Sequence, residues 1–287
     1  MKKFLILLLA LMLCASLCSC ESMLKKVKSY VTGNEESEMP SDYVASLSNE
    51  EYQYDMYETY IILTKYVGKE SEVVIPSEID GKPVTHIGSL CFFDTETVVS
   101  SVTIPSSITA IDESAFYYSD HLESIVIPDT VESIGTRAFA WCNALETVTF
   151  GNKITSIPDY CFNHCIKLKE VNFTLNITSV GIRAYSYCDS LTDVTVLESI
   201  TKLGERAFSD CKALEFVTVD NNDIELGESV FADCGSLVVI APENSNTKAY
   251  CETNGLRWST SKSAEVTDFG KTVESEAESE DVSAESK

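Results

Sequence analysis

The sequence predicts a solenoid, in which short coils of the chain stack along one axis and share a continuous core. An apolar residue opens each unit and recurs every 23 residues without interruption: Val102, Ile125, Val148, Val171, Val194, Val217 and Ile240. Other residue types repeat with the same step, and the order of elements within each unit is also constant. A unit this short cannot bury several apolar side chains alone, so neighbouring units must stack.

Three further columns keep the 23-residue step, which excludes a chance spacing of one residue type. They hold aromatic residues, leucines and cysteines. The aromatic column is Phe116, Phe139, Phe162, Tyr185, Phe208 and Phe231; the leucine column is Leu122, Leu145, Leu168, Leu191, Leu214 and Leu237; the third is Ser119 followed by Cys142, Cys165, Cys188, Cys211 and Cys234.

Within one unit a strand, a turn and a short helical turn are expected to follow one another. Ile125 and Ile127 point inward on either side of Val126, which is strand periodicity. Pro128 ends the run because it lacks a hydrogen-bond donor. Residues 138–142 then carry apolar side chains at helical spacing. This order is the anatomy of a leucine-rich repeat, so we expect a mainly β solenoid, a right-handed superhelix of 23-residue coils with a cap at each end.

The unit resembles that of the BspA-type leucine-rich repeat family of bacterial surface proteins, L-x-x-I-x-I-P-x-x-V-x-x-I-G-x-x-A-F-x-x-C. The resemblance extends from about residue 54 to residue 258. Departures are local, because Phe150-Gly151 and Phe173-Thr174 lack the proline and Cys161 stands where alanine is usual. We expect them to alter single turns and to leave the fold intact.

The amino-terminal segment is predicted to be a lipoprotein signal peptide. Its apolar run, residues 4–13, follows two lysines and is shorter than the roughly 20 apolar residues that span a bilayer. Leu17, Ser19 and Cys20 resemble a bacterial lipobox, in which Cys20 becomes the lipid-modified first residue. An ordinary secretory signal is the alternative. With the lipid, the mature protein is anchored to a membrane and does not cross it.

The remaining boundaries follow from periodicity and composition. Within the first coil, Ile87 precedes Ile111 by 24 residues, so this coil is one residue longer than the others. The predicted segments are the signal peptide 1–20, a flexible tether 21–51, an amino-terminal cap with a degenerate first coil 52–101, six 23-residue repeats 102–239, a carboxyl-terminal cap 240–258, and an acidic disordered tail 259–287.

The carboxyl-terminal cap is expected to close the end of the core. Residues 248–250 predict a last helix, Gly255 its carboxyl cap, and Leu256 and Trp258 a covering strand. A solenoid end needs such a polar lid.

The chain is strongly acidic, with a formal charge of -24 that becomes -26 when Lys2 and Lys3 leave with the signal. So negative a surface repels phosphate backbones and anionic lipid headgroups, which excludes nucleic acids as partners. It suits a protein kept soluble outside the cell that meets basic partners or divalent cations. We expect a monomer that contacts the membrane only through its lipid.

Eleven cysteines first suggest disulfides in an exported protein. Cys14 and Cys18 leave with the signal and Cys20 carries the lipid, which leaves eight. Stacked coils hold side chains parallel at about 4.8 Å, whereas a disulfide needs converging Cβ atoms at about 3.8 Å. We therefore expect a buried row of small side chains. Because these residues occupy the family's inward cysteine slot, the hypothesis is that all eight remain thiols.

The sequence shows no pattern typical of catalysis. It lacks a P-loop, G-x-S-x-G, H-E-x-x-H or dinucleotide fingerprint, and its histidines fall at different places in the repeat. Cys161, His164 and Cys165 are the only cluster resembling metal ligands, but a structural zinc site needs four ligands and Cys165 belongs to a core column. We expect no enzymatic activity, no metal and no cofactor.

Solenoids bind through long continuous surfaces, and two outward stripes are candidates. The first stripe lies one position before the cysteine column and would stack four rings about 5 Å apart into a ladder. Alternatively, these rings only shield the predicted helical turn from water. The ladder residues are Tyr118, Trp141, His164 and Tyr187. If they bind a partner, replacing Trp141 and Tyr187 by alanine should abolish binding without unfolding the protein.

The second stripe is the outward face of the first strand of each unit. Its residues are Thr103, Val126, Thr149, Asn172, Thr195 and Thr218, with Phe216 beside them. β-Branched residues are expected on any exposed strand. That expectation explains the threonines better than it explains Phe216 and Val239, which we expect to face outward near the carboxyl end.

The resemblance implies a cell-surface, lipid-anchored protein that acts in adhesion or ligand binding, with host matrix proteins or neighbouring cells as partners. Its place would be the bacterial cell envelope, exposed at the surface. A second interpretation is an envelope scaffold that organises other bacterial components. Protease treatment of intact cells separates the two, because only an adhesin must be exposed.

Overall fold

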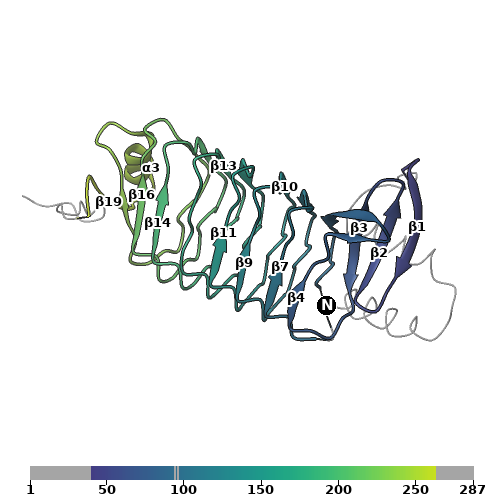
Figure 1. The fold of residues 1–287 in the computed structure, drawn as a ribbon. Helices are drawn as coiled ribbons and strands as arrows, with labels where there is room; N and C mark the ends of the chain where they lie inside the picture. The colour runs from purple at the N-terminus through teal and green to yellow at the C-terminus, as the bar shows by residue number, and fades with distance from the viewer. Residues whose placement is uncertain (1–39, 94, 96, 263–287) are drawn as a thin grey trace, which may run out of the picture. The chain divides into compact units, whose positions relative to one another are not determined.

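The computed structural model describes residues 40–93, 95 and 97–262, and in this part the chain winds into a solenoid (Figure 1). The chain divides into two compact units, Met1–Tyr43 and Val44–Lys287, and every element below lies in the second apart from the first residue of β1. The predicted signal peptide, most of the tether and most of the acidic tail lie outside the described residues. No helix in the described part is long and apolar enough to span a bilayer.

Most coils contribute one short strand to each of two rows, and neighbouring strands pair in parallel with one break in each row. In the second row the break separates Ser133–Ile134 from Ser156–Ile157. The predicted 23-residue step sets the register, as when Val148 pairs with Ile125 and Val180 with Ile157. The first row comprises β4 (Glu72–Val74), β7 (Ser101–Thr103), β9 (Ser124–Val126), β11 (Thr147–Thr149), β14 (Asp193–Val196), β16 (Phe216–Val219), β18 (Val238–Ile240) and β19 (Arg257–Ser259). The second comprises β6 (Lys82–Ile87), β8 (Ala110–Ile111), β10 (Ser133–Ile134), β12 (Ser156–Ile157), β13 (Ser179–Val180), β15 (Lys202–Leu203) and β17 (Glu225–Leu226).

The first row is interrupted once, between β11 and β14. It consists of two four-stranded sheets, ordered β11-β9-β7-β4 and β14-β16-β18-β19, and a single bridge from Thr149 to Asn172 lies between them. The interruption falls in the coil where Phe173 and Thr174 replace the usual isoleucine and proline. The departure from the repeat pattern therefore has a local effect, and the coils continue beyond it.

A continuous core runs through the coils, and the aromatic column forms a stack within it. Successive rings lie 4.7 Å apart between Phe92 and Phe116, 5.1 Å between Phe116 and Phe139, and 5.2 Å between Phe162 and Tyr185. These side chains are fully buried. Burying one phenylalanine contributes about 1.5–3 kcal/mol, so the column is a main source of stability.

The column next to it contains buried thiols that bond one coil to the next. The eight cysteines of the described residues are free and buried, in agreement with the hypothesis. The Sγ of Cys142 donates to the carbonyl of Phe116 at 3.1 Å, and that of Cys188 donates to Phe162 at 3.4 Å. The Oγ of Ser119 makes the same bond at 3.3 Å to the carbonyl of Phe92. The position thus requires a small side chain that carries a donor.

The amino-terminal cap is an antiparallel arrangement of β1 (Tyr43–Ser48), β2 (Tyr52–Tyr57) and β3 (Ile61–Tyr66), and β3 pairs in parallel with β6. Because β1 lies inside the segment predicted as a tether, the cap begins earlier than predicted. The pairing of Ile87 with Ile111 confirms the 24-residue coil. In the first row Val73 pairs with Val102, 29 residues on, because a hairpin of β5 (Glu78–Ile79) with β6 is inserted there.

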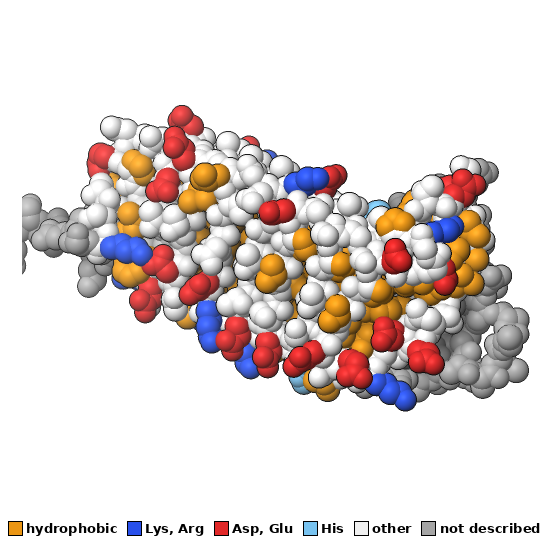
Figure 2. Space-filling view, viewed as in Figure 1, with side chains coloured by type: hydrophobic (Ala, Val, Ile, Leu, Met, Phe, Trp, Pro, Cys, Tyr) orange, Lys and Arg blue, Asp and Glu red, His pale blue; other side chains and the backbone are white. Residues whose placement is uncertain are grey.

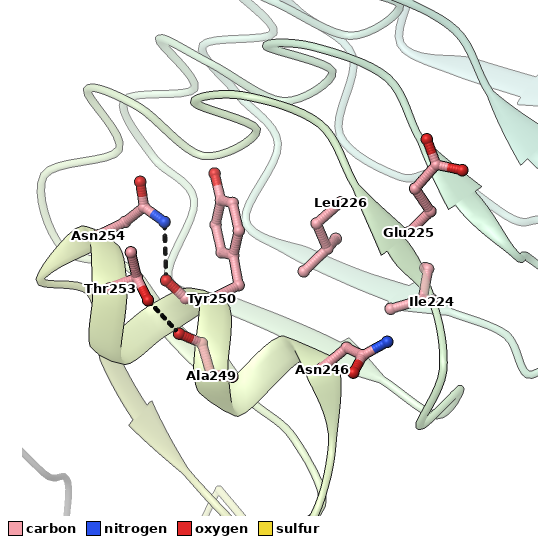
Figure 3. A pocket seen from close by; sticks show the side chains of 8 residues that line it. All are labelled: Ile224, Glu225, Leu226, Asn246, Ala249, Tyr250, Thr253 and Asn254. Carbon is pink, nitrogen blue, oxygen red and sulfur yellow. Dashed lines mark hydrogen bonds between the residues drawn. The ribbon is translucent and has the colours of Figure 1, made fainter.

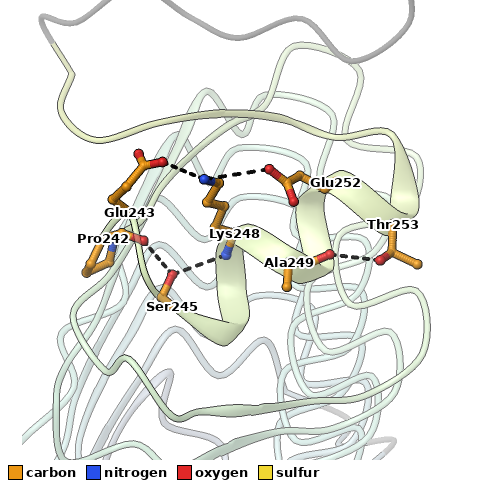
Figure 4. Close-up of polar contacts among 7 residues, drawn as sticks. All are labelled: Pro242, Glu243, Ser245, Lys248, Ala249, Glu252 and Thr253. Atoms are coloured by element: carbon orange, nitrogen blue, oxygen red, sulfur yellow. Dashed lines mark hydrogen bonds and ion pairs between the residues drawn. The ribbon is translucent and has the colours of Figure 1, made fainter.

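The carboxyl-terminal cap has the predicted helix (Figure 4), and a glycine cap and a strand follow it as predicted. Helix α3 (Asn246–Asn254) begins after Ser245, whose Oγ accepts the N–H of Lys248 at 3.2 Å. It ends at Gly255 with φ 65°, a left-handed conformation that glycine adopts at little cost. The ammonium of Lys248 lies 2.5 Å from Glu243 and 3.8 Å from Glu252.

The last coil is one residue shorter than the predicted repeat. Val217 pairs with Val239 and not with Ile240, so this coil has 22 residues. The shift places Val239 inside, where it is 0% exposed and also pairs with Trp258 of β19. The expectation that Val239 faces outward is therefore wrong, because the cap strand fixes the register of β18.

Candidate functional site

After its second strand, each coil makes consecutive β-turns where a short helical turn was predicted. The N–H of Ser119 donates to the carbonyl of Phe116 at 3.0 Å and closes one turn. The N–H of Tyr118 instead donates to the carbonyl of Ala140 in the next coil, also at 3.0 Å. A helix directs its N–H groups along its own axis, so it would lose these bonds between coils.

Two residues per coil, four positions apart, adopt the left-handed conformation, with φ between 50° and 64°. For a residue other than glycine this costs roughly 1–2 kcal/mol, and asparagine, aspartate and histidine tolerate it best. The first column is Ser114, Arg137, Tyr160, Arg183, Arg206 and Ser229. The second is Tyr118, Trp141, His164, Tyr187, Asp210 and Asp233. The predicted ladder is thus the first part of a left-handed column.

The four predicted ladder residues stack on one another in register. Tyr118 and Trp141 have ring centroids 5.1 Å apart with planes at 9°, and Trp141 and His164 are 3.8 Å apart at 7°. His164 and Tyr187 follow at 4.2 Å and 18°. Repetition of one backbone conformation in successive coils explains this alignment. We call these four residues the aromatic ladder.

Between its two end rings, the aromatic ladder presents ring edges to solvent, because the faces that neighbouring rings share are occupied. Tyr118 is 40% exposed and Tyr187 is 36% exposed, while Trp141 and His164 are half-buried. Ring edges carry partial positive charge, and tyrosine hydroxyls and ring nitrogens add hydrogen-bonding groups. A partner therefore cannot slide a flat group between these rings. It can accept hydrogen bonds along their edges or stack on an end ring.

His164 occupies the middle of the ladder and is held there by a polar neighbour. Its Nδ1 lies 2.8 Å from the amide oxygen of Asn163, which fixes the plane of the ring. Burial lowers the pKa of His164 below its ordinary 6.5, and the charges of Asp189 and Asp210 oppose this effect. The ladder therefore contains a neutral imidazole at neutral pH.

The second predicted stripe, the outward face of the first strand row, is exposed along most of its length. Val126 is 62% exposed, and Figure 2 shows hydrophobic side chains in small separate patches along most of the coils, with a larger group near the amino-terminal strands. The exposed members are Thr103, Val126, Thr149, Asn172 and Thr195, and Thr218 is half-buried.

Phe216 is half-buried and packed against the segment that follows the cap. The ammonium of Lys262 lies 5.2 Å from its ring centroid and also pairs with Asp193. Phe216 is therefore already in contact with a cation of its own chain, which weakens its candidacy as a binding residue.

A hollow of about 400 Å³ lies between α3 and β17 (Figure 3). The hydroxyl of Tyr250, which lines it, accepts the N–H of Val230 at 2.8 Å. Thr253 and Asn254 donate to carbonyls of the same helix at 2.8 Å. Because these polar groups are engaged in holding the cap, the hollow offers no convergent set of groups for a ligand.

Cys161, His164 and Cys165 do not converge on one point. Both thiols are buried in the core, and the Sγ of Cys165 donates to the carbonyl of Phe139 at 3.2 Å. His164 belongs to the outward ladder. Within the part of the chain that the structure describes, no group of three potential ligands is placed to hold a metal ion.

The sequence matches the family described as BspA type leucine rich repeat region, in six copies over residues 70–190 and 109–238. These matches span more than half of the chain. A comparison with curated protein sequences gives no match.

Two solved structures share the architecture. A leucine-rich cell surface protein from Faecalibacterium prausnitzii is 30% identical, with a TM-score of 0.60, over 72% of this chain and 56% of that one. A leucine-rich repeat protein from Eubacterium ventriosum is 26% identical, with a TM-score of 0.56, over 69% of this chain and 51% of that one. This chain therefore spans about half the length of these two relatives.

Proposed function

Since the chain belongs to the BspA-type leucine-rich repeat family, we propose that it is a lipid-anchored bacterial surface protein that binds a partner protein through the aromatic ladder. The similar protein from Faecalibacterium prausnitzii is described as a cell surface protein, which supports the location. The lipobox-like Cys20 supports the anchor and lies outside the described residues. Solenoids of this kind present surfaces and need no catalysis, so we propose no enzymatic role.

The observation that carries the proposal is the placement of four consecutive ring side chains at left-handed positions. Folding alone favours glycine, asparagine, aspartate or histidine there, and the next two coils indeed have Asp210 and Asp233. This preference accounts for His164 but not for Tyr118, Trp141 and Tyr187. Strained residues that persist in a repeat point to a role beyond packing. The core beneath is already complete, because the buried aromatic column stacks independently of the ladder.

A protein partner fits this surface better than the other classes of ligand. The charge of -24 repels nucleic acids and anionic membranes. Stacked ring edges offer hydrogen bonds and apolar area along a line, as protein interfaces rich in tyrosine and tryptophan do. The strand-face stripe remains a second candidate, but its exposed side chains are those expected on any outward strand.

The binding test is capture of partners from the bacterium's own surroundings by the purified full chain. Trp141→Asn and Tyr187→Asn remove rings while introducing a residue that tolerates the left-handed conformation. We expect captured proteins to be lost with both variants and retained with Val126→Ser on the strand face. Circular dichroism must show that all three variants are folded. If only Val126→Ser lost the captured proteins, the strand face and not the aromatic ladder would be the binding surface.

Location is tested on intact cells. Protease should remove the repeat region from the surface, and Cys20→Ser should release the protein from the membrane fraction. A repeat region that stays protected on intact cells would instead indicate an internal envelope scaffold, and adhesion would be ruled out.

A further inference from the structure

At the carboxyl end of the aromatic ladder, Tyr187 is followed in the next coil by Asp210. We call this change from a ring to a short carboxylate side chain the step. Both residues, with Asp233 after them, belong to one left-handed column with φ of 63°, 60° and 59°, so their side chains leave the backbone in register. One face of Tyr187 stacks on His164 at 4.2 Å. The next residue of the column, in the following coil, is Asp210, whose side chain is too short to cover a phenol ring. Tyr187 is accordingly 36% exposed.

The step is electrostatically suited to a cation. Within the described residues, the carboxylates of Asp210 and Asp233 take part in no ion pair. The nearest cation on the chain, Lys212, pairs with Asp189 at 2.9 Å, and its charge acts on Asp210 and Tyr187 without forming an ion pair or a ring contact with either. The negative face of the Tyr187 ring adds to the attraction for positive charge.

The other left-handed column contains an internal example of the same contact. The guanidinium of Arg137 lies 4.7 Å from the ring centroid of Tyr160 in the adjacent coil. There the column itself supplies a cation for the ring. At Tyr187 the following coil supplies an aspartate. Among the described residues, no cation of the chain is stacked on this ring.

We propose that the face of Tyr187 and the carboxylate of Asp210 bind the guanidinium of an arginine on the partner protein. The inference deepens the proposed function, on which it rests, by making the partner basic. Arginine fits better than lysine because its planar group can stack on a ring while donating to a carboxylate. The acidic surface as a whole would steer such a partner toward the step.

The probe is a fluorescein-labelled peptide of alternating glycine and arginine, with lysine and glutamate versions, titrated with the full chain by fluorescence anisotropy. We expect the arginine peptide to bind more tightly than the lysine peptide, and the glutamate peptide not to bind. Tyr187→Asn and Asp210→Asn should each weaken the arginine peptide about two- to fivefold. Both introduce asparagine, which suits the left-handed backbone.

Asp223→Asn is the matched control, since it removes one negative charge from an exposed loop away from the ladder column. It should leave the affinity unchanged. Equal weakening by Asp210→Asn and Asp223→Asn would show attraction by net charge only and overturn the proposal. An unchanged affinity with Tyr187→Asn would also overturn it.

The two proposals fail separately. If Trp141→Asn abolishes partner capture while Asp210→Asn leaves it intact, the arginine site is wrong and the ladder function stands. If Asp210→Asn weakens the arginine peptide while the ladder variants capture partners normally, the step binds guanidinium and the proposed ladder function is wrong.

Discussion

The left-handed backbone of Trp141 predicts that glycine should replace this residue with less loss of stability than alanine. Trp141 has φ 64° and stacks on Tyr118 at 5.1 Å and on His164 at 3.8 Å. Either substitution removes both ring contacts. The two variants differ only in how easily the new residue adopts the left-handed conformation.

The magnitudes follow from the two contacts and from the backbone. Each stacked aromatic pair contributes about 0.5–1.5 kcal/mol beyond its buried area, so losing two costs about 1–3 kcal/mol in either variant. Alanine retains the left-handed penalty, roughly 1–2 kcal/mol. Glycine avoids this penalty but loses more backbone entropy on folding, by about 0.5–1 kcal/mol. Trp141→Gly should therefore be more stable than Trp141→Ala by about 0.5–1 kcal/mol.

Urea unfolding followed by circular dichroism measures this difference, provided that the slopes of the transitions agree. Thr149 supplies the matched position, because it is exposed on β11 and has no left-handed backbone. There the usual order should hold, with glycine less stable than alanine by about 0.5–1 kcal/mol. If the same order appeared at Trp141, the backbone argument would be refuted, and a fully stable Trp141→Ala would refute the stacking argument.

Three further predictions concern the thiols and the ladder histidine. Cys188→Ala should lower the free energy of unfolding by about 1–3 kcal/mol, because the carbonyl of Phe162 loses a donor and a small cavity forms. Cys188→Ser should lower it less, since Ser119 makes the same bond at the equivalent position of an earlier coil. The midpoints of urea unfolding test this order. Because burial holds the pKa of His164 below 6.5, the unfolded chain takes up a proton before the folded one, so stability should fall as the pH drops below about 6.5. His164→Asn should flatten that slope, and a wild-type slope of opposite sign would mean that the ring faces stabilise imidazolium. Finally, the buried column thiols, such as Cys142 with its raised pKa, should resist a thiol reagent in the native protein and react in urea.

The solenoid was predictable because its determinants are repeated in the sequence. A column such as Phe116, Phe139 and Phe162 fixes both the step and the inward direction, and parallel stacking then fixes the neighbours of every other position. The aromatic ladder followed from the same register. The register did not predict whether the faces or the edges of the rings are accessible to a partner, because accessibility depends on how closely the ring planes stack.

The left-handed turns were not predictable from local sequence. The apolar spacing of residues 138–142 fits a helical turn as well as it fits successive β-turns. The positions with positive φ carry serine, arginine, tyrosine, tryptophan, histidine and aspartate, and no glycine occurs at them to signal the conformation. Only the hydrogen bonds to the next coil, such as that from Tyr118 to Ala140, select the turns, and those bonds exist only once the coils have stacked.

The two ends differed from the prediction for another reason. Leu237 and Ile240 keep the three-residue spacing of Leu214 and Val217, so nothing in the repeat reveals the shorter last coil. The pairing of β18 with β19 decides it, and that pairing depends on a segment outside the repeat. Similarly, β1 has no periodicity of its own and becomes a strand by pairing with β2.

The contiguity of the aromatic ladder has an energetic explanation that also bears on its role. Each coil contacts only its neighbours, so a lone ring at a left-handed position would bear the backbone cost without a stacking partner. Four rings in a row make three stacked pairs, worth about 1.5–4.5 kcal/mol in total, against a left-handed cost of roughly 1–2 kcal/mol for each of the four. Stacking alone therefore does not offset the left-handed cost of the rings, and the next two coils use aspartate without stacking. Since stacking does not explain four consecutive rings, contact with a partner is the better explanation.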